Sequence, residues 1–572
     1  MIEDSKVGRL LALLERSGVP SELDDVLAGR PGPPGLPYRA VLTGLMLSSH
    51  YLGRATLADA WWILFHCLRP KARSWLGVPE HAPADDHARV ATSRRVYRTF
   101  DRITTALDPA RRDRRRRLPA AEADQVAAAW ESPANATTVH RLARLANRLV
   151  LAPVVSARDR GHLRGWEGHV GVDATAVPVM SRPASRRTGL GSIEASAGWH
   201  FSGGATEGVF GYSAHLLVAA HRGCQNPVRY PQLCLGLALD TPGKRIGANA
   251  IALLNDLAEL GLPTGVCAAD RAYTGQRPEE FQVPVRRLGY ALALDYKVTE
   301  RGPQGSFRGA PIVDGHLACP LMPDVLRGAT IGREDKEIRH PDEDLAAAIT
   351  ARAPFWLHRK QGPDQRGSIR VQCPAAGPSP TLNCPRREHL HPPTPSPDTA
   401  PPPRIVRLAD ARGRRAHPAA RPTVLLPDDE RTDPPPRGHQ PAICRQSTMT
   451  VHADQAAPKY RQDQPYLSPA WEASYKSVRS HTEGKNSQVK GIKVDIGNPK
   501  HRPVRGRVGH HLTVAVLLMI ANLDMLDRWR HRTAGSAAPD ERDRAKACEP
   551  YPADPTTHAS DAPDLPPPDI GN

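Results

Sequence analysis

The sequence predicts an α/β protein in which a helical amino-terminal part precedes a mixed sheet flanked by helices. Three observations support this fold class. Amphipathic patterns with helical spacing fill residues 1–150, short apolar runs typical of strands begin near residue 168, and a proline-rich stretch interrupts the regular patterns between 361 and 440. With 572 residues, the chain is long enough for more than one domain with its own core.

Residues 1–150 are predicted to form an all-α domain, with DNA binding as its candidate role. Apolar residues recur at helical spacing in the segments 7–14, 38–52, 57–68, 90–107 and 138–151. Between the last two, the run from Arg111 to Arg117 contains six arginines. The sequence leaves two interpretations of this run open, namely a solvated loop and an arm that contacts phosphate groups.

Residues 165–300 are predicted to form the first part of a mixed sheet and its helices. Apolar, β-rich runs occur at 169–179, 211–221, 233–240, 264–270 and 289–298, and an amphipathic helix is expected at 247–260. Three strands, a helix and two further strands in this order indicate an α/β arrangement in which helices cover the sheet.

The remaining chain is predicted to divide into three segments. Residues 301–464 form an insertion that is proline-rich and largely irregular in 361–440, because such a composition cannot build a packed core. Residues 465–532 return to regular structure, with a helix from Ser468 to Gln488 and a strongly apolar helix from His511 to Arg530. Residues 533–572, rich in Asp, Pro and Ala, are expected to form a disordered tail.

The charge balance favours a polyanionic partner. Lys and Arg number 77 against 60 Asp and Glu, a net charge of +17, and cations that neutralise phosphates release bound counterions. A generally basic composition without a nucleic-acid partner is the alternative.

The nine cysteines are scattered and odd in number, and the longest apolar run, 514–521, is too short to span a bilayer. We therefore expect a cytoplasmic protein without membrane contact.

Three carboxylates are candidates for catalysis. Asp173 lies in the apolar run GVDATAVPV and Asp270 ends the run VCAAD, where an ionised side chain is costly unless it is paired or bound to metal. Glu483 lies in a predicted helix, with Arg479 and Lys490 on the same face. Carboxylates on separate elements suit two Mg²⁺ ions, or Mn²⁺, that act in phosphoryl transfer. A capped polar residue and a solvated ion-pair face are the alternatives.

The order and context of these residues resemble the DDE transposases of bacterial insertion sequences. One group of this family carries a Tyr-x2-Arg-x3-Glu-x6-Lys signature around its catalytic glutamate, and Arg479, Glu483 and Lys490 match that spacing. Tyr475 stands one residue earlier than the signature tyrosine. The phrase ADRAYTG, which begins its Asp-x-Ala-Tyr motif at Asp270, matches the second motif of the family. The resemblance covers about 165–300 and 465–530.

The resemblance implies an RNase H-like catalytic core with Asp173, Asp270 and Glu483 as ligands of two Mg²⁺ ions. It implies a transposase that cleaves DNA strands and transfers them, in which Arg479, Lys490 and Tyr475 contact phosphate. Its partners would be double-stranded DNA, at the element ends and the target, and a second copy of the chain in the DNA complex. Two alternatives stay open: an inactive DNA-binding remnant of a transposase, and a zinc-organised nucleic-acid-binding protein.

Four cysteines in the insertion are candidates for a structural zinc site. They are Cys319, Cys373, Cys384 and Cys444, of which the first three are each followed by proline. Four thiolates suit tetrahedral Zn²⁺, but none of the four forms a close C-x2-C pair. His389 and His391 are alternative ligands, and unrelated buried or free thiols are the alternative to a metal site.

Overall fold

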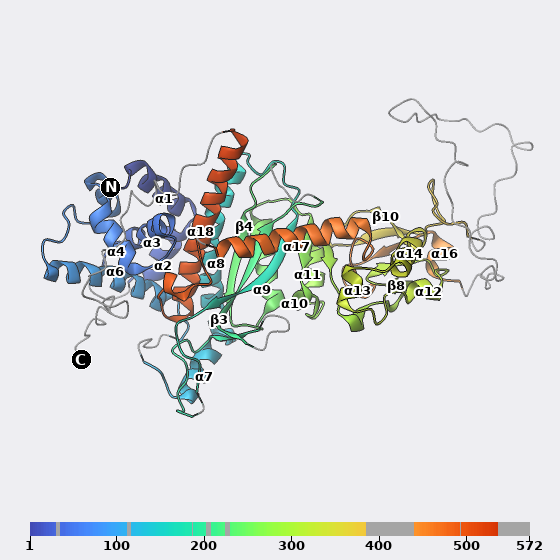
Figure 1. Ribbon diagram of the computed structural model, residues 1–572, viewed down its shortest axis with the longest axis horizontal. Helices are drawn as coiled ribbons and strands as arrows, with labels where there is room; N and C mark the ends of the chain where they lie inside the picture. Colours follow the sequence, from blue (N-terminus) through green and yellow to red (C-terminus); the bar gives the residue numbers. More distant parts are fainter. Residues whose placement is uncertain are drawn as a thin grey trace, which may run out of the picture. The chain divides into compact units, whose positions relative to one another are not determined.

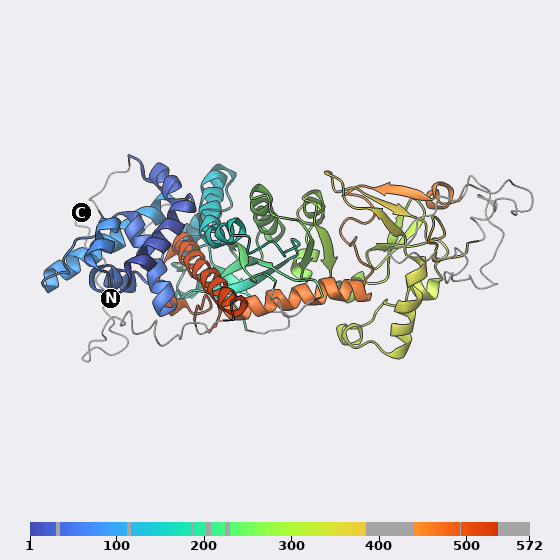
Figure 2. The same cartoon turned by 90° about the horizontal axis from the view of Figure 1, so that it is seen from above.

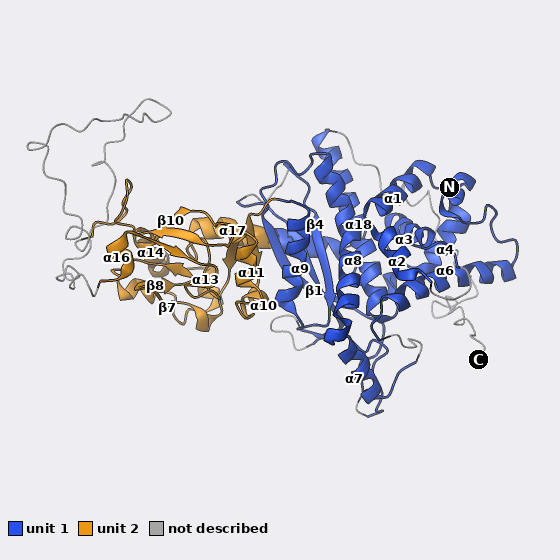
Figure 3. Ribbon diagram, turned by 180° about the vertical axis from the view of Figure 1, so that it is seen from behind, with its two compact units in different colours: residues 1–262, 480–572 blue, residues 263–479 orange. Residues whose placement is uncertain are grey.

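A computed structural model describes the chain except residues 30–34, 111–115, 186, 202–206, 224–228, 385–439, 492 and 536–572. The chain forms two compact units (Figure 3). Unit 1 contains 1–262 and the chain from 480 onward, and unit 2 contains 263–479. Most of the arginine run, most of the proline-rich stretch 361–440, the two histidines considered as zinc ligands and most of the expected tail lie outside the described residues.

Unit 1 begins with helices, as the amphipathic patterns of residues 1–150 predict (Figure 1). These are α1 (Asp4–Arg16), α2 (Val19–Leu27), α3 (Tyr38–Leu52), α4 (Leu57–Trp62), the π-helix η1 (Ile63–Cys67), α5 (Pro70–Leu76), α6 (Asp86–Ala106), α7 (Ala120–Ala129), the 3₁₀ turn η2 (Pro133–Asn135) and α8 (Ala136–Asp159). The segment 57–68, expected as one helix, is thus an α-helix that continues as a π-helix. The apolar faces of these amino-terminal helices pack together in one hydrophobic core.

The sheet of unit 1 is antiparallel and centred on one strand. Strand β3 (Val209–Ala219) pairs with β1 (Val170–Pro178), with β2 (Gly198–His200) and with β4 (Cys234–Asp240). Most of β3 and all of β4 are buried, so both strands are almost continuously apolar. Helix α9 (Ile246–Glu259) packs on β3 and β4, and α8 packs on β4.

The last helix of unit 1, α18 (Gly506–Thr533), follows the 3₁₀ turn η8 (Pro499–His501) and fills the centre of the unit (Figures 1 and 2). It packs against α8, α3 and β4. Among the described residues, α18 alone is long and apolar enough to cross a membrane, and 94% of its most apolar window is buried inside the protein. That burial is what a central core helix requires.

Unit 2 contains a parallel strand pair followed by two small antiparallel sheets. Strand β5 (Val266–Ala269) pairs in parallel with β6 (Ala291–Leu294), and the helices α10 (Arg271–Thr274) and α11 (Gln282–Arg287) connect them. The small sheets are β7 (Pro303–Phe307), β8 (Ala310–Val313) and β9 (His316–Leu317), and β10 (His358–Gln361), β11 (Ile369–Gln372) and β12 (Thr448–Val451). The other elements are η3 (Val298–Glu300), α12 (Asp324–Arg327), α13 (Asp335–Arg339), α14 (Glu343–Ala351), η4 (Ala353–Phe355), α16 (Ala442–Gln446) and the start of α17 (Pro469–Val489).

The protein is a mixed α/β protein with many helices and both parallel and antiparallel strand pairs, which confirms the predicted fold class at this level. The strand expected at 289–298 is shorter, because Asp295 leaves the ladder and accepts a hydrogen bond from the Tyr466 hydroxyl at 2.7 Å. The small sheets of unit 2 were not anticipated, since their strands of two to five residues are too short for a clear alternation.

Candidate functional site

Asp173 lies within β1, opposite Leu216 of β3. Its side chain is partly buried and accepts hydrogen bonds from the backbone and from a side chain. The backbone N–H of Ala174 donates to Oδ1 at 2.9 Å, and Nδ2 of Asn486 donates to Oδ2 at 3.0 Å. These donors offset part of the cost of placing a carboxylate in an apolar strand, and the second donor comes from α17.

One face of α17 is directed at Asp173 within unit 1. Glu483, Asn486 and Lys490 follow one another at spacings of three and four residues, so they share a face of the helix and its end. Asn486 contacts Asp173 directly, and Lys490 interacts with it electrostatically. The Glu483 side chain is exposed and lies one turn before Asn486. Unit 1 therefore holds the strand of the first predicted carboxylate against the helix of the third.

Lys490, at the end of this face of α17, has a lowered pKa. Desolvation lowers the pKa of Lys490, although its side chain as a whole is exposed, and the carboxylates of Asp495 and Asp173 oppose that shift. Burial also lowers the pKa of His200, with Lys490 as a second cause. The end of β2 therefore lies near Lys490, and His200 Nδ1 is 3.4 Å from the Ser213 hydroxyl.

Helix α17 is anchored to the chain just before β4. Gln232 donates from Nε2 to the backbone carbonyl of His481 at 2.8 Å. In return, Lys485 donates from Nζ to the carbonyl of Gln232 at 3.0 Å. Lys485 is fully buried, and this desolvation lowers its pKa to about 8. These bonds fix the turn of α17 that carries Glu483, because they attach the residues on either side of it.

Asp270 follows β5 in unit 2 and caps α10. Its Oδ1 accepts the backbone N–H of Ala272 at 3.0 Å, so the Asp-x-Ala-Tyr motif forms a helix start. Nη1 of Arg479 lies 3.9 Å from Oδ2 of Asp270. Tyr475, one turn earlier on α17, stacks on Trp471 with ring centroids 4.8 Å apart, and burial raises its pKa. The predicted residues Asp270, Arg479 and Tyr475 therefore gather in unit 2.

The sequence analysis did not identify two features near these residues, namely Asn486 and a network of ion pairs. Asn486 could have been found, since it lies on the same helical face as Glu483. The second group is an ion-pair network in which Arg271 binds Asp295 at 2.9 Å and Asp335 at 2.5 Å, while Arg301 also binds Asp335. These arginines lower the pKa of Asp335 well below its usual range. No local pattern could have indicated this network, because Asp335 follows Arg271 by 64 residues.

The donor chemistry of the three carboxylates suits a hard divalent cation, since carboxylate oxygens are the protein ligands of Mg²⁺. Asp173 and Glu483 belong to unit 1, whereas Asp270 belongs to unit 2. Within the part of the chain that the structure describes, no three His, Cys, Asp or Glu side chains are already arranged to hold a metal ion.

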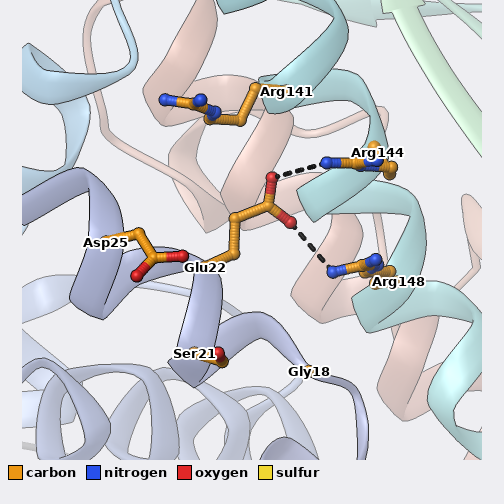
Figure 4. A pocket seen from close by; sticks show the side chains of 7 residues that line it. All are labelled: Gly18, Ser21, Glu22, Asp25, Arg141, Arg144 and Arg148. Carbon is orange, nitrogen blue, oxygen red and sulfur yellow. Dashed lines mark hydrogen bonds and ion pairs between the residues drawn. The ribbon is translucent and has the colours of Figure 1, made fainter.

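A pocket of about 360 Å³ lies between α2 and α8 in the helical part of unit 1 (Figure 4). Arg141, Arg144 and Arg148 lie on one face of α8, spaced by three and four residues. Glu22, buried at 8% exposure, binds Arg144 at 3.3 Å and Arg148 at 2.9 Å. Gly18, Ser21 and Asp25 complete the lining. Three guanidinium groups around one pocket are a candidate phosphate contact.

In comparisons with protein-family models, with curated proteins and with solved structures, nothing matched the chain.

Proposed function

We propose that the protein is a DDE transposase with an RNase H-like core that cleaves and joins DNA strands. The observation that carries the proposal is the hydrogen bond of 3.0 Å from Asn486 to Asp173. It joins the strand of the first motif to the helix of the third motif, although the two residues are 313 positions apart. The resemblance of the motifs and the charge of +17 support the same function.

The residues of the chain have distinct roles in this proposal. The carboxylates of Asp173, Asp270 and Glu483 would hold two Mg²⁺ or Mn²⁺ ions, which when bound supply an activated nucleophile and a stabilised leaving oxygen. Asn486 orients the Asp173 carboxylate through its hydrogen bond. Arg479 and Lys490 would contact DNA phosphates on either side of Glu483, and Tyr475 lies one turn before Arg479 on the same helix. The partner would be double-stranded DNA, bound by a homodimer.

The experiment is the variant Glu483→Gln in the full chain. The substitution keeps the size of the side chain and its helix propensity, so the protein should fold. It removes the negative charge that would hold metal, so Mg²⁺-dependent nicking of an element end should fall to background. Binding to the same DNA should persist, because a carboxylate that repels phosphate has been removed.

Glu472→Gln is the matched control. Glu472 lies on the same helix, is exposed and pairs only with Lys476 in the described ion pairs, at 2.5 Å. It should leave nicking unchanged. Equal nicking by wild type and Glu483→Gln would refute the role of Glu483. A wild-type chain that binds DNA without any metal-dependent nicking would instead indicate an inactive remnant.

A further inference from the structure

Four buried thiols gather in unit 2, away from the predicted carboxylates. Cys319 follows β9, Cys373 follows β11, Cys384 lies in the next loop and Cys444 lies in α16. Their exposed fractions are 2%, 6%, 6% and 8%. These four residues, here called the thiol cluster, come from four separate segments of the chain.

Backbone hydrogen bonds hold these segments together. The N–H of Cys373 donates to the carbonyl of Ser447, at the end of the helix that carries Cys444, at 2.8 Å. The N–H of Cys319 donates to the carbonyl of Phe355 at 2.7 Å. Thr381, three residues before Cys384, joins both neighbourhoods: its N–H donates to the carbonyl of Pro374 at 2.9 Å, and its hydroxyl donates to the carbonyl of Pro354 at 2.9 Å.

The sulfur atoms are close enough to influence one another. Burial raises the pKa of Cys319, and each of the other three cysteines adds to that rise. A hydrogen bond from the backbone of Leu321 to the Cys319 sulfur has the opposite effect. A cation bound among these sulfur atoms would compensate the repulsion between their thiolates.

The local backbone around two of the cysteines is suited to a thiolate. The carbonyl of Cys319 accepts the N–H of Met322 at 3.0 Å, and the carbonyl of Cys373 accepts the N–H of Ala376 at 2.9 Å. Both segments begin with Cys-Pro, so each forms a tight turn that starts at the cysteine. In the first turn an N–H already points to the sulfur. Such outer donors stabilise metal-bound sulfur.

We propose that the thiol cluster binds one Zn²⁺ ion through the thiolates of Cys319, Cys373, Cys384 and Cys444. Four sulfur ligands favour Zn²⁺, which takes four thiolates in a tetrahedral, closed structural site. Binding converts four S–H groups into four Zn–S bonds and releases four protons to solvent. Thiols without metal pack as small apolar groups, so they need not converge on one point before deprotonation. The described residues contain no ready-made metal group, so the four sulfur atoms would converge on binding.

The zinc ion would act as a structural link. Cys384 and Cys444 lie on either side of the segment 385–439, so one ion would join the two ends of this segment. Closing a loop of this length in the unfolded chain has an entropic cost, and a metal bound only in the folded state offsets it. The proposal is independent of the carboxylates and of DNA cleavage.

The test is the metal content of the purified full-length chain, expressed in zinc-supplemented medium. About one zinc ion per chain is expected for a closed four-thiolate site, and Cys373→Ser should retain well under half of it. Cys267→Ala is the matched control, because Cys267 is a fully buried thiol of the same unit outside the cluster. It should keep the zinc content of the wild type. Equal zinc in wild type and a folded Cys373→Ser variant would overturn the proposal.

A second measurement covers the case in which Cys373→Ser does not fold. Zinc should leave the wild-type chain when a mercurial reagent modifies its thiols, and Co²⁺ added to the metal-free chain should give the intense visible bands and thiolate charge-transfer band of a tetrahedral sulfur site. A wild-type chain with no zinc and no such cobalt spectrum would overturn the proposal, as would iron and sulfide in place of zinc. Nicking of DNA by that same chain would leave the proposed transposase function intact.

Discussion

Asn486 is the residue on which the geometry of the candidate site in unit 1 depends. Its amide donates to Asp173 at 3.0 Å, and its own place is fixed because Lys485 beside it is buried and bonded to Gln232. The N–H₂ group of this amide can only donate, so its hydrogen bond orients the carboxylate while the remaining lone pairs of the carboxylate oxygens stay available for a cation. We therefore regard Asn486 as a positioning residue for Asp173.

Asn486→Ala should reduce metal-dependent nicking roughly 10–100-fold, the usual effect of losing a group that orients a metal ligand. The loss should be partly relieved at higher Mg²⁺ concentration, because the weakened step is the alignment of a ligand rather than the chemistry itself. Nicking rates measured over a Mg²⁺ titration check this. Ser487→Ala, an exposed neighbour on α17, is the control. Identical Mg²⁺ titration curves for Asn486→Ala and wild type would contradict the assigned role.

At the scale of elements, α18 organises unit 1 through polar groups as well as apolar ones. Asn522 is fully buried and links three elements. Its Oδ1 accepts the N–H of Cys234 in β4 at 2.8 Å, and its Nδ2 donates to the carbonyls of Cys234 at 2.8 Å and of Val150 in α8 at 3.1 Å. Because the Asn522 amide can both donate and accept, it pairs with backbone N–H and C=O groups that would otherwise be buried without partners.

Asn522→Ala should lower the free energy of unfolding by about 2–5 kcal/mol, because it leaves buried backbone donors and acceptors unpaired and creates a small cavity. Urea unfolding followed by circular dichroism measures the change. Thr533→Ala, at the exposed end of the same helix, should shift the midpoint very little. Similar midpoints for the two variants would show that the Asn522 bonds contribute little to unit 1.

At the scale of the whole molecule, unit 1 buries many titratable groups. Burial lowers the pKa of His215 and of His221 to about 4 and that of His511 to about 3. The carboxylates of Glu194 and Asp240 are buried with cationic or hydrogen-bonding partners, and these partners lower their pKa against the effect of desolvation. The folded state therefore binds fewer protons than the unfolded state in mildly acidic solution.

Stability should consequently fall as the pH decreases from about 6.5 to about 4. In this window the histidines of the unfolded chain, with an ordinary pKa of 6.5, become protonated, whereas the same histidines in the folded protein stay neutral. For each of His215 and His221, whose pKa falls from 6.5 to about 4, the loss should be roughly 3 kcal/mol at about 1.4 kcal/mol per pKa unit. Urea midpoints at pH 7, 5.5 and 4.5 measure it. A midpoint that stays constant over this range would show that these histidines are accessible to protons in the folded state.

The net charge of +17 predicts DNA binding that weakens steeply with salt. Arg141, an exposed residue of the pocket between α2 and α8, offers a local test of DNA binding (Figure 4). Arg141→Gln should lower the slope of log K against log[salt] by about one if that guanidinium contacts a phosphate. An unchanged slope would place the DNA elsewhere on the protein.

The sequence alone determined where most elements of unit 1 occur and which class of fold they build. Helical periodicity located α3 and α8, and apolar runs located β1, β3 and β4, because one buried face imposes a repeat on neighbouring residues. It also selected Asp173 and Asp270, since carboxylates in apolar strands are unusual enough to be noticed without a structure.

Only the tertiary structure decided which side chains meet. Asn486 reaches Asp173 across 313 residues, and Arg271 reaches Asp335 across 64 residues. The strands of unit 2 are likewise stabilised by long-range partners, such as the pairing of Ile369 with Val451. Contacts of this kind depend on how the chain closes on itself in three dimensions, whereas a periodic pattern records only the burial of a local face.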